Sequence, residues 1–280
     1  RLITDWSQVR TLAGVQLNKM RDFNQAYVSN GVWPFREGIF KRWSFDKYSD
    51  TNKPAVFFGV YDQSDIDRVN GHKGEKIIVF MGNDINYYGH LWKDDPKAFH
   101  VSYGPYRKNL ESKGVKVFNH VTPFKSYSRY KPNKLGDCIY VYKGFISSRP
   151  KHYGWESIVE PLIKEFGRRV IWTERQSEED LKNNFYSKCF AYVKPNPTGG
   201  STTMWEMAHM GRRTFTQGHS DLGFGFTEDY TDVNDLIEKL RKEESKIGTI
   251  PLEICYSAIE ALDDTDDWLK RSYYENNDSN

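Results

Sequence analysis

A glycine-rich turn followed by a helix that carries one carboxylate is the part of this sequence best suited to chemistry. Residues 194–213 read KPNPTGGSTTMWEMAHMGRR. Gly199 and Gly200 lack a Cβ atom, so a ligand can approach their backbone closely. The helix expected from about Ser201 presents free N–H groups and a positive dipole end, which suit a phosphate or pyrophosphate. The same pattern also fits an ordinary helix start, capped by Thr198 or Ser201.

Glu206 lies about five residues inside this expected helix, among apolar neighbours. A carboxylate there can accept two hydrogen bonds from a vicinal diol, such as that of a ribose one pyrophosphate length away. The alternative is a partly exposed helical glutamate without a ligand. The residues expected to bind a ligand in this stretch are Pro197, Thr198, Gly199, Gly200, Ser201, Thr202 and Glu206.

Two further polar segments follow expected strands. Lys143 and Arg149 come after the strand expected over residues 139–142, where basic side chains would neutralise a diphosphate. The strand expected over residues 169–173 ends at Thr173 and is followed by Arg175, so polar groups there can meet the edge of a base. For the basic segment, a solvated loop is an equally good interpretation.

Strand-like runs alternate with helical patterns along the whole chain, which favours parallel sheets covered by helices. The expected strands are 55–61, 76–81, 98–102 and 115–119 in the first half, and 139–142, 169–173, 190–193 and 214–216 in the second. Residues 6–28 read as a helix, and the polar stretch 127–136 reads as a linker. We therefore expect an α/β protein with two Rossmann-like domains facing a central cleft. The expected parts are residues 1–130, residues 138–250, and a C-terminal helix that crosses back with an acidic tail, 251–280. Ligands of such sheets bind beyond the carboxyl ends of the strands.

Composition excludes some classes of partner. The 280 residues carry a formal net charge of +2, so charge alone does not indicate nucleic acid. An odd, sparse set of three cysteines predicts reduced thiols in a cytosol-like compartment. No apolar run approaches 18 residues, so we expect a soluble, cytoplasmic protein without a membrane span.

Aromatic residues make up 15% of the chain, and several gather near the N-terminus. They are Trp33, Phe35, Phe40, Trp43, Phe45 and Tyr48. Core and loop packing is the first interpretation of this group. The second is a platform for sugar rings or bases, because flat apolar faces stack on both.

The second half resembles the donor-binding domain of glycosyltransferases with the GT-B fold. The resemblance covers roughly residues 138–273 and rests on the order of the elements: a strand with a basic loop, a strand and turn, the segment SEEDLKNNFYSKC, the strand FAYVKPN, the glycine turn, the helix MWEMAHMG, the strand RRTFTQG, and the later stretch GFGFTEDYTDVNDLIEKL. It implies an enzyme that takes a sugar from a nucleotide-sugar donor, most often UDP-linked. Glu206 would hold the ribose, and the amides of residues 199–203 with Arg149 or Lys143 would hold the pyrophosphate.

The resemblance also implies partners and a setting. The acceptor would be an oligosaccharide or glycoprotein hydroxyl. No cofactor or metal would be needed, because a helix dipole and basic side chains can stabilise the departing diphosphate. In size and general character the chain resembles enzymes of bacteria and of large DNA viruses such as chloroviruses. A chlorovirus-like enzyme would glycosylate capsid glycans, with UDP-xylose as one candidate donor.

One position departs from the family pattern. Many retaining members carry E-x7-E across this turn and helix, but the residue eight before Glu206 is Thr198. We therefore expect an inverting reaction, in which a base from the first half deprotonates the attacking hydroxyl. Asp84, after the run KIIVFMGN, is the first candidate for this base, with a turn aspartate as its other interpretation. The reserve candidates are Asp62, His100 and His120.

Three alternatives stay open. Asp65 and Asp67 spell D-x-D, the pattern of a metal-dependent GT-A-type transferase, although a helix capped by Ser64 would explain both carboxylates electrostatically. A second alternative keeps the fold but modifies DNA bases, and the near-neutral charge speaks against it. The third is a nucleotide-binding module without catalysis.

Overall fold

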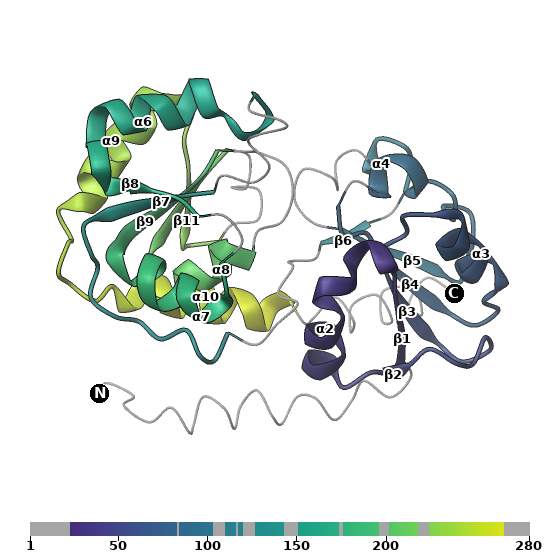
Figure 1. Ribbon diagram of the computed structural model, residues 1–280. Helices are drawn as coiled ribbons and strands as arrows, with labels where there is room; N and C mark the ends of the chain where they lie inside the picture. Colours follow the sequence, from purple (N-terminus) through teal and green to yellow (C-terminus); the bar gives the residue numbers. More distant parts are fainter. Residues whose placement is uncertain are drawn as a thin grey trace. The chain divides into compact units, whose positions relative to one another are not determined.

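The computed structural model describes residues 23–82, 84–102, 110–115, 117–119, 127–142, 151–173, 176–195, 202–217 and 224–265. The chain divides into two compact units. The first unit comprises Arg1–Lys125 with Asp263–Asn280, and the second comprises Ser126–Leu262. Each unit contains a parallel β-sheet with helices on its faces (Figure 1).

The sheet of the first unit has the strand order β2-β1-β3-β4-β5-β6, and all its described pairings are parallel. Its strands are β1 (Gln25–Val28), β2 (Asp46–Lys47), β3 (Ala55–Phe58), β4 (Lys76–Val79), β5 (Ala98–Ser102) and β6 (Val117–Asn119). Its helices are η2 (Asn30–Phe35), α2 (Arg36–Trp43), α3 (Gln63–Gly71) and α4 (Asp84–Tyr88). Every residue of β3 and β4 is buried, as expected for strands covered on both faces.

The two faces of this sheet carry different helices. Ile39 and Trp43 of α2 pack on one face. Val69 of α3 and Ile85 of α4 pack on the other. The chain therefore changes face between the β1–β2 connection and the β3–β4 connection, which makes the β1–β3 boundary a topological switch point.

The sheet of the second unit has the order β11-β10-β9-β7-β8, again with parallel pairings. Its strands are β7 (Cys138–Val141), β8 (Val170–Ile171), β9 (Cys189–Lys194), β10 (Arg213–Thr216) and β11 (Thr227–Asp229). Its main helices are α6 (Glu160–Phe166), α7 (Glu178–Asp180), α8 (Thr202–His209), α9 (Val233–Glu244) and α10 (Leu252–Thr265). When the strands of each unit are numbered from its first strand, both sheets have the order 2-1-3-4-5, and the first sheet has one more strand at its end. The switch point of the second sheet therefore lies between β7 and β9.

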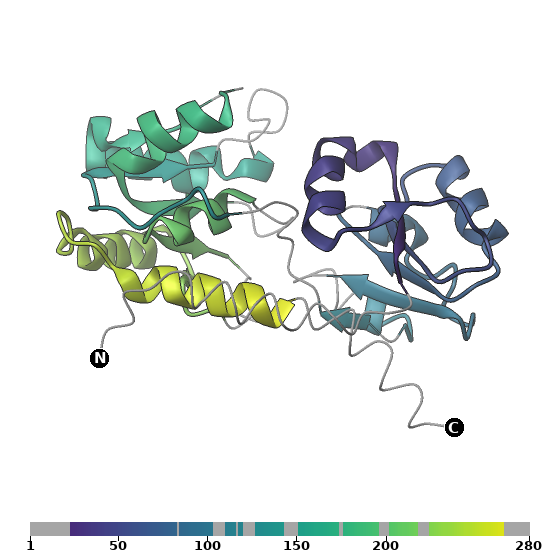
Figure 2. The same ribbon diagram turned by 90° about the horizontal axis from the view of Figure 1, so that it is seen from below.

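Helices α6 and α9 cover one face of this second sheet, and α8 and α10 lie on the other (Figure 1). On the α6–α9 face, Leu162 and Leu240 pack against Val193 and Phe215. In the view from below, α10 appears as one continuous helix (Figure 2).

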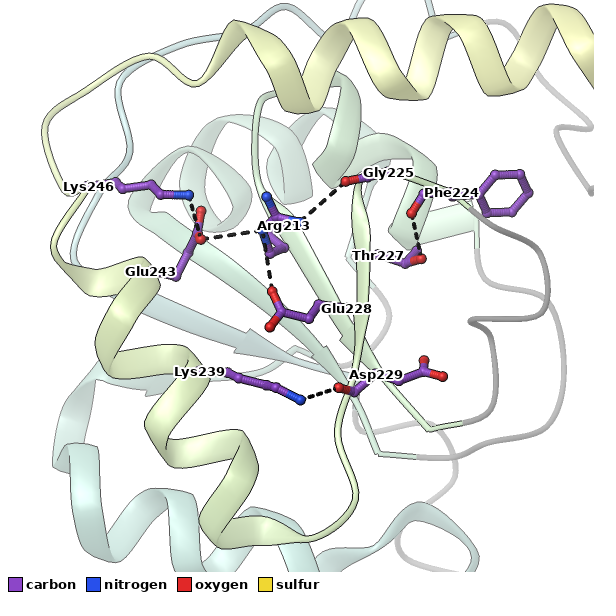
Figure 3. Close-up of polar contacts among 9 residues, drawn as sticks. All are labelled: Arg213, Phe224, Gly225, Thr227, Glu228, Asp229, Lys239, Glu243 and Lys246. Carbon is purple, nitrogen blue, oxygen red and sulfur yellow. Dashed lines mark hydrogen bonds and ion pairs between the residues drawn. The ribbon is translucent and has the colours of Figure 1, made fainter.

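A polar network fixes the edge strand β11 to helix α9 (Figure 3). The Arg213 side chain lies 3.4 Å from the Glu243 carboxylate and 3.8 Å from that of Glu228. Lys246 approaches Glu243 at 2.9 Å, so this nearly buried carboxylate faces two cations. Lys239 donates to the backbone carbonyl of Asp229 at 2.6 Å. The edge of the sheet is thus held by charged groups as well as by its strand pairing.

Two expectations about the first unit are corrected by the structure. The N-terminal helix expected to reach residue 28 is wrong at its end, because Gln25–Val28 forms strand β1, paired with β3. Helix α3 is capped by Asp62 and not by Ser64: the Asp62 carboxylate accepts from the Asp65 N–H at 3.0 Å, in a capping box. The error at β1 has a simple reason: a strand of four residues carries too little periodicity to be separated from a helix in the sequence.

The expected linker 127–136 is also wrong, because this segment packs into the second unit. Tyr127 and Tyr130 are 2% exposed and Leu135 is 3% exposed. Arg212 is fully buried and donates to the carbonyl of Lys134 at 2.9 Å and to that of Cys189 at 3.1 Å. The polar composition of the segment suggested a linker, because the residues that it packs against are distant in the sequence.

Among the described residues, the structure contains no helix of sufficient length and apolarity to span a bilayer.

Candidate functional site

At the switch point of the second sheet, β7 and β9 lie side by side, and each is followed in the sequence by one of the segments expected to bind a ligand. The basic segment that begins at Lys143 follows β7, and the glycine-rich segment follows β9. These two strands are neighbours, and the Tyr142 N–H donates to the carbonyl of Val193 at 3.1 Å. Both segments therefore leave the same edge of the sheet from adjacent positions, where parallel α/β sheets bind their ligands.

Most of the expected binding residues in these segments lie outside the described residues. They are Lys143, Arg149, Arg175, Pro197, Thr198, Gly199, Gly200 and Ser201. The described members of the expected set are Thr173, Thr202 and Glu206. Thr202 is the first residue of α8, and Thr173 comes two residues after β8.

Glu206 is buried on α8, with 4% of its surface exposed. Tyr186, from the short helix η7 (Tyr186–Lys188), is buried beside Glu206, and side-chain hydrogen bonding with Thr203 and Glu206 affects its pKa. Burial raises the pKa of Tyr186 far above its usual value, and the charge of Glu206 raises it further. Tyr186 therefore stays protonated beside the carboxylate. A carboxylate offers about four acceptor positions, the kind of group that can bind a vicinal diol.

Tyr140 lies near this carboxylate and contacts Thr173. Their hydroxyl groups are 2.8 Å apart, which links the carboxyl ends of β7 and β8. Burial raises the pKa of Tyr140 to about 12, and the negative charge of Glu206 contributes to the increase. The Tyr140 and Tyr186 rings meet edge to face, with centroids 5.1 Å apart. The structure thus gathers Thr173 and Glu206 with two tyrosines that the sequence analysis missed.

A row of polar residues crosses the carboxyl ends of three neighbouring strands. Lys194 of β9, Thr216 of β10 and Asp229 of β11 are direct partners in the sheet register. The Thr216 hydroxyl lies 3.2 Å from the Asp229 carboxylate. Lys194 is 2% exposed, and burial lowers its pKa to about 7. Lys194 ends an otherwise apolar strand directly before the glycine-rich segment, a signal that the sequence already contained.

In the first unit, Asp84 also lies at the carboxyl end of a strand, after β4. Its carboxylate accepts hydrogen bonds from the N–H groups of Val60 at 3.1 Å, Gly82 at 2.9 Å and Met81 at 3.3 Å. The residue is 1% exposed, and burial raises its pKa to about 6. Through these hydrogen bonds Asp84 joins the segments that follow β3 and β4 and holds them in position.

The reserve candidates for a base are placed differently from one another. Asp62 is exposed and caps α3 just after β3. His100 is buried, stacks on Phe80 at 6.0 Å between ring centroids, and has its pKa lowered to about 4 by burial. His120 lies outside the described residues.

The two carboxylates of the D-x-D pattern do not meet. Asp65 is 1% exposed and accepts from the hydroxyl of Tyr27 at 2.6 Å, the hydroxyl of Ser29 at 2.7 Å and the N–H of Tyr61 at 2.8 Å. Asp67 is exposed and accepts from Gln63 on its own helix. Residues two positions apart on a helix point in different directions, so this pair forms no shared metal site. Among the described residues, no group of three or more metal-ligating side chains occurs.

Comparison with solved structures supports the fold. The chain is similar to the sucrose-phosphate synthase of Thermosynechococcus elongatus, with a TM-score of 0.50 and 11% sequence identity over 86% of this chain and 76% of that one. A weaker similarity, from which nothing is inferred, is to AviGT4, a glycosyltransferase involved in avilamycin A biosynthesis, with a TM-score of 0.41 and 11% identity over 89% of this chain and 98% of that one. At such identity the first likeness concerns the fold alone, and with the two parallel sheets it confirms an α/β protein with two Rossmann-like units. No protein-family model matches the sequence, and no curated protein is significantly similar to it.

Proposed function

We propose that this protein is a glycosyltransferase that moves a sugar from a UDP-sugar donor to a hydroxyl of a glycan acceptor, with inversion and without a metal. One observation carries the proposal: Glu206 is buried beside Tyr186, on the helix that follows β9, the strand that borders the switch point of the second sheet. A fixed carboxylate acceptor beside a helix start suits a ribose diol joined to a pyrophosphate. UDP-xylose is one candidate donor.

In this mechanism the second unit binds the nucleotide. Glu206 accepts from the ribose hydroxyls, and Thr173 lies at the strand end expected to meet the base. Thr202, with Gly199, Gly200, Ser201, Pro197 and Thr198 in the preceding segment, holds the pyrophosphate. Lys143, Arg149 and Arg175 are proposed to add positive charge, which stabilises the diphosphate as it departs.

Asp84 is the first candidate for the base that deprotonates the acceptor hydroxyl. Its pKa of about 6 is close to neutral pH, as a general base requires. Its oxygens face backbone N–H groups, so the acceptor must reach a carboxylate that is 1% exposed. Asp62 is the second candidate, because it is exposed at the end of the neighbouring strand.

A nucleotide panel tests the proposal directly. Melting temperatures are measured with UDP, GDP, ADP, CDP and the UDP-linked sugars, at concentrations well above the expected dissociation constants. A ligand that binds only the folded protein at 100 times its Kd adds about 2.7 kcal/mol to the free energy of unfolding. We expect a rise in Tm with UDP compounds. If no nucleotide raises Tm, the donor assignment is wrong.

The two candidate bases are separated by single substitutions. Asp84→Asn and Asp62→Asn are each assayed for release of UDP from the donor and for UDP affinity. The variant that lacks the base should lose about a hundredfold or more in turnover, the usual contribution of a positioned base, with UDP affinity within twofold of the parent. Loss of turnover only in Asp62→Asn would leave Asp84 as a positioning residue. If neither variant loses turnover, both candidate bases are wrong. If the parent protein binds UDP but turns the donor over only at background, and neither substitution changes this, a nucleotide-binding module without catalysis is the better description.

A further inference from the structure

A pocket of about 470 Å³ lies on the first unit, at the junction of η2 and α2. Its walls are Trp33, Pro34, Arg36, Glu37 and Phe40. This volume falls within the range of small-molecule sites. None of the five residues belongs to the proposed donor site, so the pocket requires its own explanation.

Trp33 differs from the other aromatic residues of this stretch. Trp43 and Phe45 are 6% and 7% exposed and belong to the hydrophobic core, as the packing interpretation of the sequence expected. Trp33 is 55% exposed. Its indole ring therefore contributes little to the core; it lines the pocket, with the Arg36 guanidinium over one of its two faces. Such surfaces bind the C–H faces of sugar rings or the faces of bases.

The polar groups of the pocket favour a sugar. The Arg36 guanidinium lies 4.3 Å from the centroid of the Trp33 ring and 5.8 Å from that of Phe40, so the two rings hold a set of N–H donors in place. The Glu37 carboxylate supplies acceptors in the same pocket. One cation beside one anion gives no net preference for a phosphate or an ammonium ligand. Donors, acceptors and an apolar face together match a neutral polyol ring.

The surrounding fold places this pocket at a binding position and makes it rigid. Helix η2 follows β1, at the carboxyl end of the strand that borders the switch point of the first sheet. The buried Asp65 carboxylate accepts from the Ser29 hydroxyl and the Tyr61 N–H, and the Ser29 oxygen in turn accepts from Gly31 at 3.1 Å. A Cβ at Gly31 would lie 2.6 Å from the Tyr61 ring, so only glycine fits this turn without a shift. The loop that carries Trp33 is thereby tied to two strand ends.

We infer that this pocket binds one pyranose ring of a neutral glycan, with the ring's C–H face on Trp33 and its hydroxyls on Arg36 and Glu37. The assignment of this glycan as the acceptor rests on the proposed function. The pocket as a sugar site rests on its own lining.

Binding of simple glycosides tests the inference. The probes are the methyl pyranosides of glucose, galactose, mannose, rhamnose, fucose and xylose, studied by saturation-transfer NMR and then titrated. We expect at least one to bind with a millimolar dissociation constant. Trp33→Ala should weaken that binding about tenfold, in line with the energy of an aromatic contact, and Trp33→Phe should retain most of it. Arg36→Ala should weaken it as well.

Tyr87→Ala is the matched control, because Tyr87 is 64% exposed on α4 and does not line the pocket. It should leave glycoside binding unchanged. If none of the six glycosides binds, or if Trp33→Ala binds them as well as the parent protein, the inference is overturned. UDP affinity measured on the same variants separates the two proposals. Trp33-dependent glycoside binding without any UDP binding would keep the sugar pocket and remove the transferase. UDP binding without glycoside binding would keep the proposed transferase and remove the sugar pocket.

Discussion

At the scale of single residues, the side chains closest to the proposed chemistry are buried ones. Glu206 lies beside Tyr186, and Lys194 ends the strand that precedes the glycine-rich segment. Burial fixes a side chain in one orientation, and it also changes the free energy of its charged form. Substitutions at these positions therefore affect ligand affinity and pH dependence in ways that can be measured separately.

Glu206→Gln is the sharper test of the ribose contact, because it keeps the shape of the side chain and removes the charge. Loss of charge-assisted hydrogen bonds to a diol costs about 1.5–3 kcal/mol, which corresponds to roughly 10- to 150-fold weaker UDP binding by calorimetry. Tyr186→Phe should weaken binding less, since it only releases the carboxylate. Unchanged UDP affinity in Glu206→Gln would refute the ribose assignment.

Lys194 should impose a pH dependence on stability. Its pKa in the folded protein is about 7, below the usual value of 10.5. Between these values the unfolded chain holds a proton that the folded chain lacks, so the free energy of unfolding rises with pH, by at most about 1.4 kcal/mol per pH unit. Below pH 7 both states hold the proton, and the unfavourable contribution is constant. Lys194→Met should flatten the stability profile between pH 7 and 10 in urea denaturation. An identical slope in parent and variant would contradict this.

At the scale of elements, buried ionic groups fasten the segments that carry the sites. In the first unit the carboxylates of Asp65 and Asp84 collect hydroxyl and N–H groups from the ends of β1, β3 and β4. In the second unit the Arg212 guanidinium collects carbonyls from the segment before β7 and from the start of β9. Each group satisfies several backbone atoms that would otherwise be buried without a partner.

Arg212→Met should be among the most destabilising single substitutions in the second unit. Arg212 is fully buried, and its loss removes a donor from the carbonyls of Lys134 and Ser187 and one of two donors from that of Cys189, which also accepts from the Gly136 N–H. We expect a loss of about 3–5 kcal/mol in the free energy of unfolding. The neighbouring Arg213 is partly exposed, and its buried partner Glu243 keeps its ion pair with Lys246, so Arg213→Met should cost less, about 1–2 kcal/mol. Equal losses in the two variants, measured by chemical denaturation, would disprove the role given to Arg212.

At the scale of the whole molecule, charge and metal chemistry set the remaining expectations. The net charge is +2, and Asp65 and Asp67 point apart. If the proposed reaction uses helix and side-chain charges for the diphosphate, donor turnover should persist within twofold in excess EDTA. A fall in turnover that Mg²⁺ or Mn²⁺ restores would reinstate the metal-dependent alternative. Retardation of duplex DNA in a gel at moderate salt would reinstate the DNA-modifying one.

The sequence by itself determined the α/β class, the two Rossmann-like units and the positions of the long buried strands. These features depend on periodicity and on apolar runs such as those of β3, β4 and β9, which are local properties of the chain. The sequence also located the segments after the strand ends that the site proposals use, because the glycine-rich turn and Glu206 directly follow a predicted strand.

Tertiary structure alone decided what surrounds those residues. Strand β1 is defined by its pairing with β3, which the sequence does not reveal. The polar segment before β7 packs against Arg212 and His209, and these partners lie too far away in the sequence for the packing to be predicted. The partnership of Glu206 with Tyr186, the buried surroundings of Asp65 and Asp84, and the exposure of Trp33 likewise depend on contacts between distant residues. Burial and hydrogen-bond partners are properties of the folded chain, and no local pattern of letters specifies them.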